Sequence, residues 1–300
     1  MANVLEISGL SKRFGSKQAL ADVTLSVPEN CVFGFVGRNG AGKTTTMKSI
    51  IGLLKPDGGD ITVCGEKVTY GGTRTNRFIG CLPDVPEFYG CMTAREYMTL
   101  CGQIAGMKAP DIKARTDELL ELVGLSDEKH RVRGYSRGMK QRLGIAQALI
   151  NRPKLLICDE PTSALDPVGR REILDILKDA GKQTSVFFST HILTDVERIC
   201  DRVAFLEGGR VALSGEIDEI RKMRSDTAVE VLPENPSDAA LLKEKFPSGE
   251  VRDGCFILKN ASPTDAEALM GFLLEHHIPV VRFERREPDL EEMFMEVIGK

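Results

Sequence analysis

Short apolar runs alternate with stretches of helical spacing over the first 222 residues of the chain. Cys31–Val36 is a continuous apolar run that stops at a glycine-rich turn, and beyond the turn Lys43–Leu54 carries apolar residues at helical spacing. This order predicts a buried strand, a loop and a helix. Other short apolar runs predict strands at Val4–Leu10, Ala19–Val27, Asp60–Val63, Lys67–Thr69, Leu155–Cys158, Ser185–Ser189 and Arg202–Glu207.

Helical patterns lie between the later strands. They cover Thr93–Gly106, Ala109–Val123, Gly138–Ile150, Pro167–Ala180 and Thr194–Cys200. Because strands that alternate with helices form mostly parallel sheets, the pattern predicts an α/β fold. A helical insertion at about residues 84–140 separates two α/β portions.

The pattern changes after about Met223. Strand, helix, hairpin, helix, strand and helix are predicted in that order at Thr227–Val231, Ser237–Phe246, Glu250–Leu258, Thr264–His277, Val280–Glu284 and Asp289–Ile298. Asp253-Gly254 supplies the hairpin turn. The order is that of a split βαβ unit. We therefore expect one domain over residues 1–222 and a small α+β domain over residues 226–300, with the boundary near residues 221–226.

The overall charge and the cysteines narrow the range of partners. A formal net charge of −4 provides no large basic surface, so we expect no nucleic acid partner. The eight cysteines form no C-x-x-C pair and follow no secretory leader, which predicts reduced thiols in a cytosolic protein. The longest apolar stretches fall far short of the roughly 20 residues that cross a bilayer, so any membrane function is expected to need a separate chain.

The glycine-rich turn and the start of the following helix match the phosphate-loop motif G-x-x-x-x-G-K-[ST]. Glycines let successive backbone N–H groups surround phosphate oxygens, and the helix N-terminus adds a favourable dipole. Lys43 is expected at the β and γ phosphates, Thr44 at Mg²⁺ and Thr45 at a further phosphate oxygen. The alternative, a glycine-rich surface turn, is disfavoured by the flanking strand and helix. The predicted nucleotide contacts are Gly37, Arg38, Asn39, Gly40, Ala41, Gly42, Lys43, Thr44 and Thr45.

Two carboxylates follow the apolar run Leu155–Cys158. Asp159 and Glu160 stand at the C-terminal end of this predicted strand, where α/β sheets bind ligands. Asp159 suits the Mg²⁺ shell, and Glu160 suits an attacking water. An acidic pair by itself is more often a helix start, but the phosphate loop reverses that preference.

With these motifs in order, residues 2–222 resemble the ATP-binding subunit of an ATP-binding cassette (ABC) transporter. Tyr135–Arg142 matches the signature segment, Ser163–Asp166 resembles the D-loop, and His191 occupies the switch-histidine position. Phe14 lies where the family places an aromatic that stacks on adenine, although simple packing is an equal alternative. The implied fold is a P-loop NTPase: a RecA-like, mostly parallel sheet with antiparallel β and helical subdomains.

The resemblance also implies roles and partners. In this family two subunits face each other head to tail, so we expect a dimer, formed by two copies of this chain, with a transmembrane permease as a further partner. The chain would then lie in the cytoplasm on the inner face of the membrane. ATP and Mg²⁺ are the implied cofactors, with Glu160 as general base and His191 holding the γ-phosphate and water. The residues implied to meet the partner's ATP are Ser136, Arg137, Gly138 and Met139.

The sequence departs from the family pattern in places. In the signature, Arg137 replaces the first glycine and Met139 replaces a glutamine, and Asp84 replaces the Q-loop glutamine that reaches Mg²⁺. Asp84 remains a possible Mg²⁺ ligand. Nearby, Phe88 and Tyr89 are expected either to line the groove that receives the permease or to close a local core.

The segment 285–294 is similar to the accessory domain of exporter-type bacterial ABC subunits, which implies export and leaves dimer support and regulation as possible roles. Soluble ABC ATPases that act on ribosomes or DNA are the alternative function. They fit less well, because the former usually carry two cassettes and the latter insert long coiled coils. A scaffold without hydrolysis is disfavoured by Lys43, Asp159 and Glu160.

Overall fold

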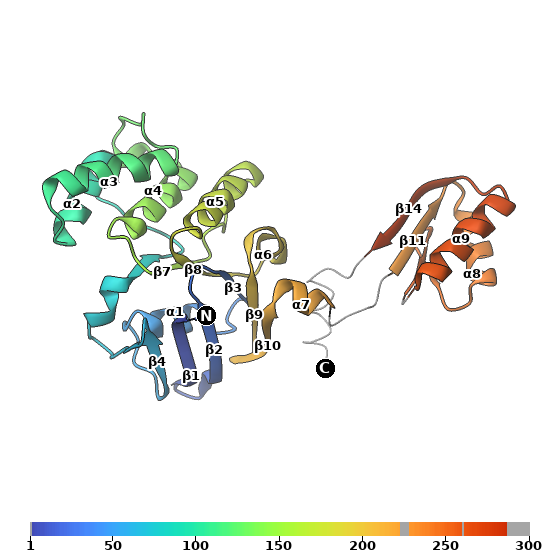
Figure 1. Ribbon diagram of the computed structural model, residues 1–300, viewed down its shortest axis with the longest axis horizontal. Coiled ribbons are helices and arrows are strands. Elements are labelled where there is room, and N and C mark those ends of the chain that lie inside the picture. Colours follow the sequence, from blue (N-terminus) through green and yellow to red (C-terminus); the bar gives the residue numbers. More distant parts are fainter. Residues whose placement is uncertain (1, 223–227, 260, 287–300) are drawn as a thin grey trace. The chain divides into compact units, whose positions relative to one another are not determined.

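The computed structural model describes residues 2–222, 228–259 and 261–286. It divides into two compact units, Met1–Ile217 and Asp218–Lys300, and each unit is described by itself (Figure 1). This division lies a few residues before the predicted boundary. No helix within the described ranges is long and apolar enough to span a membrane.

A six-stranded sheet forms the centre of the first unit. Its strand order is β10-β9-β3-β8-β7-β6, and all neighbouring pairs are parallel except β9 with β10. The strands are β3 (Val32–Val36), β6 (Ile79–Leu82), β7 (Leu155–Asp159), β8 (Ser185–Thr190), β9 (Arg202–Glu207) and β10 (Arg210–Glu216). The predicted mostly parallel α/β sheet is thus confirmed.

The edge strands β6 and β10 were not predicted. In β6, Gly80 interrupts a short apolar run, and glycine weakens a strand signal. The structure explains the glycine, because a Cβ at this position would lie 2.1 Å from the carbonyl oxygen of Ala148 in a neighbouring helix. The close approach of that helix is a tertiary feature that local sequence does not reveal.

A second, antiparallel sheet has the order β2-β1-β4-β5. Its strands are β1 (Asn3–Phe14), β2 (Lys17–Pro28), β4 (Gly58–Val63) and β5 (Glu66–Lys67). β1 and β2 are longer than predicted because they pair with each other beyond their apolar segments, up to the turn at Gly15, where φ is 57°.

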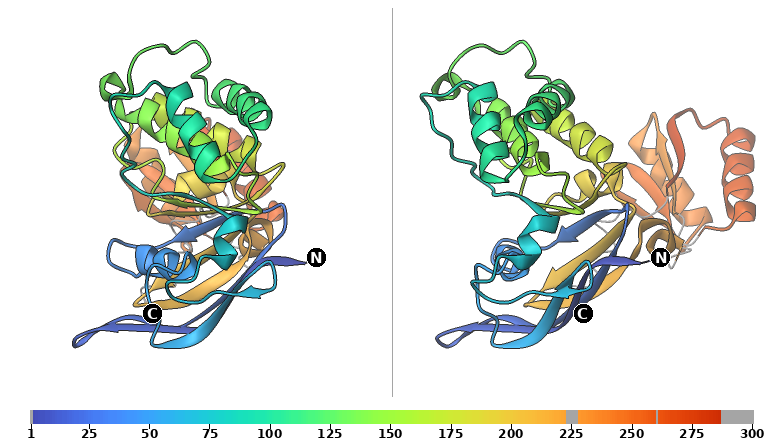
Figure 2. Two further views of the ribbon diagram at one scale, coloured as in Figure 1. Left: turned by 90° about the vertical axis from the view of Figure 1, so that its left-hand side faces the viewer. Right: turned by 60° about the vertical axis from the view of Figure 1, so that its left-hand side comes forward.

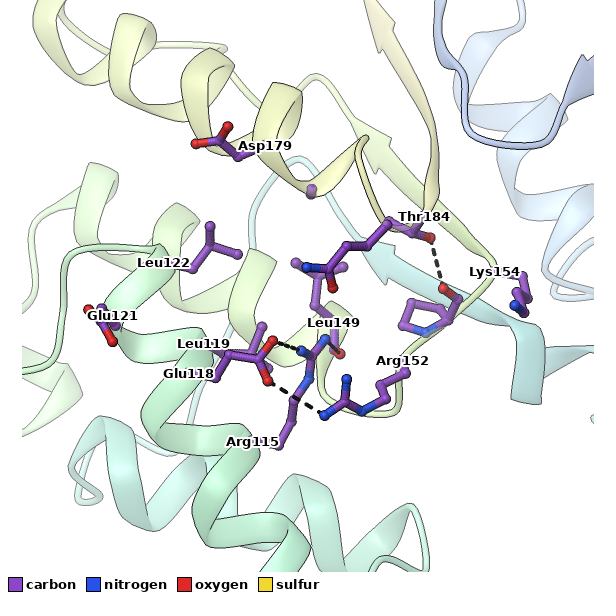
Figure 3. A pocket seen from close by; sticks show the side chains of 13 residues that line it. Arg115, Glu118, Leu119, Glu121, Leu122, Leu149, Arg152, Lys154, Asp179 and Thr184 are labelled. Carbon is purple, nitrogen blue, oxygen red and sulfur yellow. Dashed lines mark hydrogen bonds and ion pairs between the residues drawn. The ribbon is translucent and has the colours of Figure 1, made fainter.

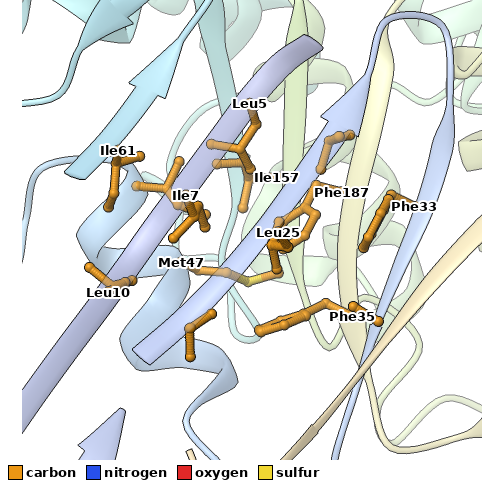
Figure 4. Packing of buried hydrophobic residues seen from close by; sticks show 14 of the residues in the cluster. Leu5, Ile7, Leu10, Leu25, Phe33, Phe35, Met47, Ile61, Ile157 and Phe187 are labelled. Atoms are coloured by element: carbon orange, nitrogen blue, oxygen red, sulfur yellow. The ribbon is translucent and has the colours of Figure 1, made fainter. Parts of the chain in front are cut away.

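The main core lies between these two sheets, with helix α1 (Lys43–Ile50) beside it. Met47 and Ile50 of α1 belong to the same buried cluster as residues of both sheets (Figure 4). The rings of Phe35 and Phe187 lie 5.2 Å apart between centroids within it. α1 ends earlier than predicted, since Gly52 adopts a left-handed φ of 73° shortly after Ile50.

The remaining helices of the first unit follow the predicted order. Helices α2, α3 and α4 lie together on one side of the unit in both figures that show the whole chain (Figures 1 and 2). Local caps set their starts: Thr93 and Glu96 form a capping box at α2, and Ser136 caps α4. The helices are α2 (Ala94–Ile104), α3 (Ala109–Leu122), α4 (Arg137–Leu149), α5 (Pro167–Ala180) and α6 (Leu193–Ile199), with α7 (Ile217–Lys222) at the unit boundary and 3₁₀ turns at Arg74–Phe78 and Val132–Gly134.

Within residues 228–286, the described part of the second unit that follows α7 is a four-stranded sheet with two helices. Its strand order is β12-β13-β11-β14, every neighbouring pair is antiparallel, and β13 lies between β11 and β12 as in a split βαβ unit. Asp253 and Gly254 have left-handed φ values of 50° and 77°, which confirms the hairpin turn. The elements are β11 (Ala228–Pro233), α8 (Pro236–Lys245), β12 (Glu250–Arg252), β13 (Cys255–Leu258), α9 (Pro263–Glu275) and β14 (Val280–Arg286). The predicted helix Asp289–Ile298 lies outside the described residues.

All eight cysteines are free thiols in the structure. Burial raises the pKa of Cys158, and neighbouring Cys81 and Asp159 add to the effect. Burial is also the main cause that raises the pKa of Cys200. Both thiols therefore stay protonated near neutral pH and act as small apolar side chains.

Candidate nucleotide site

The phosphate loop joins β3 to α1, and two of its glycines have no room for a side chain. A Cβ at Gly37 would lie 2.5 Å from the carbonyl oxygen of Leu206, and a Cβ at Gly42 would lie 2.6 Å from a methyl carbon of Leu20. Gly40 has open space around it, but its φ of 85° favours glycine. The loop therefore packs so closely against its neighbours that any larger residue at Gly37 or Gly42 would force a shift.

The loop ends at the N-terminus of α1. Gly42 is the N-cap residue, no side chain caps the helix, and the first turn contains no acidic residue. The N–H groups and the positive end of the helix dipole are thus not offset by a side chain of the chain itself. This arrangement fits a bound phosphate.

Lys43 connects the loop to the acidic end of β7. Its side chain is only 6% exposed, and its Nζ donates a hydrogen bond to the carbonyl oxygen of Gly37 at 2.6 Å. The same Nζ lies 3.0 Å from Oε1 of Glu160. A buried ammonium is thus paired with the carboxylate predicted to activate water.

Both carboxylate oxygens of Asp159 accept a hydrogen bond. Thr44 Oγ1 donates to Oδ2 at 2.8 Å, and Ser189 Oγ donates to Oδ1 at 2.6 Å. Ser189 Oγ also accepts from the backbone N–H of Glu160 at 3.0 Å. Sequence reasoning did not find Ser189, because its role follows from the register of two parallel strands, in which Asp159 lies beside Ser189.

Glu160 follows β7 in a left-handed backbone conformation, with φ at 47°, which is rare for a residue with a side chain. Its Oε2 lies 2.9 Å from Nδ1 of His191. The contact of Oε1 with Lys43 has the length of an ion pair, yet Oε1 is buried and accepts no aligned hydrogen bond. Glu160 therefore contacts Lys43 through Oε1 and His191 through Oε2.

A pocket of about 350 Å³ opens beside these groups. It is lined by Phe14, Lys17, Ala19, Asn39, Gly40, Gly42, Lys43, Thr44, Thr45, Asp84 and Glu160. Of the predicted loop contacts, Gly37, Arg38 and Ala41 belong to the loop but do not line the pocket. Phe14 is 50% exposed at its rim, and Lys17 and Ala19 were not predicted.

Comparisons with known proteins agree with this geometry. Residues 20–163 match the family model described as ABC transporter, and residues 215–298 match the C-terminal domain of ATP-binding proteins like DrrA1-3. The ABC transporter ATP-binding protein YxlF of Bacillus subtilis (strain 168) is 36% identical, over 98% of this chain and 99% of the relative.

This chain belongs to the ATP-binding subunits of ABC transporters. The bacitracin transport ATP-binding protein BcrA of Bacillus licheniformis is 34% identical, over 100% of this chain and 98% of the relative. A solved structure of the ATP-binding subunit of an ABC transporter is 34% identical and superposes with a TM-score of 0.66, over 73% of this chain and 92% of the other. The predicted cassette fold with its C-terminal domain and the predicted ATPase activity are confirmed.

The signature segment of this ABC subunit lies at the start of α4. Ser136 Oγ accepts from the backbone N–H of Met139 at 3.2 Å and so caps the helix. None of Ser136, Arg137, Gly138 and Met139 lines the nucleotide pocket of its own chain. Their predicted contact with the ATP of a partner subunit stays a prediction.

A groove of about 400 Å³ lies on the other side of Asp84. It is lined by Asp84, Val85, Pro86, Glu87, Phe88, Gly90, Val132, Arg133, Arg137 and Lys140. Phe88 packs edge-on against Tyr97, with ring centroids 5.0 Å apart, so it both lines the groove and closes a local core. Tyr89 is exposed and does not line the groove.

A further pocket of about 460 Å³ lies between α3, the end of α4 and the end of α5 (Figure 3). Three of its charged side chains form ion pairs: Arg115 with Glu118, and Glu118 with Arg152 at 3.6 Å. Arg115 also donates to the carbonyl oxygen of Leu149 at 2.9 Å, which ties α3 to the end of α4. No predicted site residue lines this pocket.

Proposed function

We propose that this ABC subunit hydrolyses ATP in the pocket beside Gly37–Thr45 to drive export through a separate transmembrane permease. The observation that carries the proposal is the place of Glu160, which lines the pocket and whose Oε1 lies 3.0 Å from the buried Nζ of Lys43. A carboxylate at a phosphate site is suited to take a proton from water.

The phosphate-binding part consists of the loop and Lys43. The loop offers backbone N–H groups and an uncapped helix N-terminus, and Lys43 offers a single buried positive charge. A γ-phosphate that binds Lys43 competes for the ammonium now paired with Glu160. ATP binding thus separates this ion pair and frees the Glu160 carboxylate for water.

Two neighbours prepare Glu160 for that step. Ser189 fixes the backbone of Glu160 by accepting its N–H, and it orients Asp159 with its own hydroxyl. His191, 2.9 Å from Oε2, holds the second oxygen of the carboxylate and so directs the first toward the pocket. We assign His191 a positioning role toward the γ-phosphate and water.

Mg²⁺ is the metal that these residues fit. Thr44 offers a hydroxyl 2.8 Å from Asp159, and Asp84 lines the same pocket. Among the described residues, no group of three or more His, Cys, Asp and Glu gathers into a metal cage. Mg²⁺ suits such a site because it usually binds one or two carboxylates together with substrate phosphates. When bound, it would neutralise charge on the phosphates.

Export and its cargo are inferred from the relatives. The similarity to BcrA, named for bacitracin transport, and to the DrrA-like C-terminal domain supports efflux of an antibiotic-type compound. The subunit would act as a dimer on the cytoplasmic face of the membrane, with the signature residues facing the partner's ATP and the groove beside Phe88 receiving the permease. Expression with its permease should raise resistance to the cargo, and a strain whose susceptibility to bacitracin and related peptides is unchanged would argue against this class.

The proposed reaction is tested with Glu160→Gln. We expect Mg²⁺-dependent ATP hydrolysis to fall on the order of 10²-fold or more, because a general base is typically worth 10²–10⁴-fold, while ATP binding persists. Glu29→Gln, in an exposed turn after β2, is the matched control and should hydrolyse ATP like the wild type. A Glu160→Gln variant with wild-type turnover would contradict the role of Glu160.

A further inference from the structure

Three residues from distant segments meet between the nucleotide pocket and the groove. Asp84 follows β6, Arg137 begins α4 and Ser163 follows β7. Ser163 Oγ donates to Oδ1 of Asp84 at 2.6 Å, Arg137 Nη2 donates to Ser163 Oγ at 3.2 Å, and the same Nη2 lies 3.6 Å from Oδ1 of Asp84. We call these three residues the Asp84 cluster.

The backbone and the side chain of Asp84 are held in different ways. Gln141, which is fully buried, donates from Nε2 to the backbone carbonyl oxygen of Asp84 at 2.8 Å. The side chains of Asp84 and Arg137 are 48% and 45% exposed. The main chain is therefore anchored to α4, while the carboxylate can exchange partners at low cost.

Asp84 belongs to both cavities, since it lines the nucleotide pocket as well as the groove, whereas Arg137 lines only the groove. The partners that its carboxylate holds in the structure, Arg137 and Ser163, belong to the cluster and not to the phosphate loop.

We propose that Arg137 is a positioning residue that, with Ser163, holds the Asp84 carboxylate, so that metal-bound nucleotide must compete with Arg137 for it. The inference rests on the proposed binding of ATP and Mg²⁺ in this pocket. When Asp84 turns to the metal, Arg137 loses its counter-charge and the groove wall becomes more positive. The cluster thus links occupancy of the pocket to the charge of the groove.

The charges predict opposite effects with and without metal. Arg137→Gln leaves the Asp84 carboxylate without its counter-charge, and this negative charge repels free ATP and attracts Mg²⁺. We expect ATP to bind about two- to fivefold more weakly in EDTA and about two- to fivefold more tightly with Mg²⁺, the range set by a partly exposed ion pair. A merely structural role would change both affinities in the same direction.

ATP affinity of the full chain is measured with Mg²⁺ and with EDTA. The ratio of the affinity with Mg²⁺ to the affinity in EDTA is then compared across variants. Arg137→Gln should raise this ratio, and Asp84→Asn should lower it. In the double variant Arg137→Gln should have no further effect, because its partner is gone. Arg137→Lys retains the charge and should stay near the wild type, and Arg171→Gln, an exposed arginine on α5, is the control for loss of one positive charge.

A second readout reports on the groove. The chain contains no tryptophan, so Tyr89→Trp places a single tryptophan next to Phe88 of the groove, at a position that is 63% exposed. ATP with Mg²⁺ should change its fluorescence, and Asp84→Asn should remove at least half of that change.

The outcomes separate the two proposals. A wild type that binds no ATP under either condition overturns both the proposed function and the Asp84 cluster. Two outcomes overturn the Asp84 cluster alone, provided that the wild type binds ATP. In the first, Arg137→Gln has the same affinity ratio as the wild type. In the second, Arg137→Gln changes the ratio as much in the Asp84→Asn background as it does alone.

Discussion

The nucleotide pocket and the pocket beside Arg115 are similar in size but differ in how their polar groups are used. The nucleotide pocket is lined by a glycine loop, an uncapped helix start and a glutamate whose carboxylate is paired with Lys43. In the pocket beside Arg115, Arg115 and Arg152 pair with Glu118, and Arg115 also donates to the backbone carbonyl oxygen of Leu149, although its Nε has no hydrogen-bond partner. The larger of the two volumes therefore belongs to the pocket that lacks a phosphate loop and an uncapped helix start.

This difference separates binding from structure. The N–H groups of an uncapped helix start are open to an anion, whereas the ion pairs and the backbone contact of Arg115 mainly join elements of the fold. Substitutions in the first pocket should therefore change ATP binding and hydrolysis, and substitutions in the second should change stability at nearly constant function.

The largest effect is expected for Lys43→Ala. Loss of the buried ammonium removes charge-assisted contacts to phosphate worth about 3 kcal/mol, so ATP affinity should fall on the order of 100-fold, as measured by titration calorimetry. Lys48→Ala changes an exposed lysine of the same helix and should bind ATP like the wild type. Equal ATP affinities of Lys43→Ala and Lys48→Ala would contradict the role of Lys43 in phosphate binding.

Arg115→Met tests the other pocket. It removes hydrogen bonds of a buried guanidinium, and we expect the free energy of unfolding to fall by about 2–3 kcal/mol in urea titrations. ATPase activity per folded molecule should stay unchanged. Arg152→Met, at an exposed member of the same network, should cost less than about 1 kcal/mol. A selective loss of ATPase activity in Arg115→Met would assign a functional role to this pocket.

Ser189→Ala sharpens the comparison within one strand. It removes the donor to Asp159 and the acceptor for the N–H of Glu160, so kcat should fall roughly tenfold, equivalent to about 1.4 kcal/mol, with little change in ATP affinity. Ser185→Ala, at the other end of β8, also loses buried hydrogen bonds and is the matched control. The two variants should be destabilised alike, and a fall in kcat in both would argue against a specific role of Ser189.

The smallest effect is expected for Phe14→Leu. If the half-exposed ring stacks on adenine, ATP affinity should fall about threefold, since aromatic stacking is worth about 0.5–1.5 kcal/mol. Phe14→Trp keeps a stacking surface and should bind as well as the wild type. An unchanged affinity in Phe14→Leu would favour simple packing.

Local patterns determined much of the molecule. The glycine loop, the acidic end of β7, the parallel sheet and the split βαβ order were all predicted from spacing and residue type, because each depends on neighbours along the chain. The helix α5 was predicted at its observed bounds, where Asp166 caps the start and Pro167 opens the first turn.

Tertiary structure alone decided how these parts complete the site. Ser189 meets Asp159 through the register of two parallel strands. Gly80 leaves room for a helix that approaches its strand closely. Asp84 meets Arg137 and Ser163, which come from other segments of the chain. Each of these contacts joins residues far apart in the sequence, and the propensities of single residues do not determine which distant residues meet. Sequence therefore predicted which groups carry the chemistry, and packing decided which side chains meet around them.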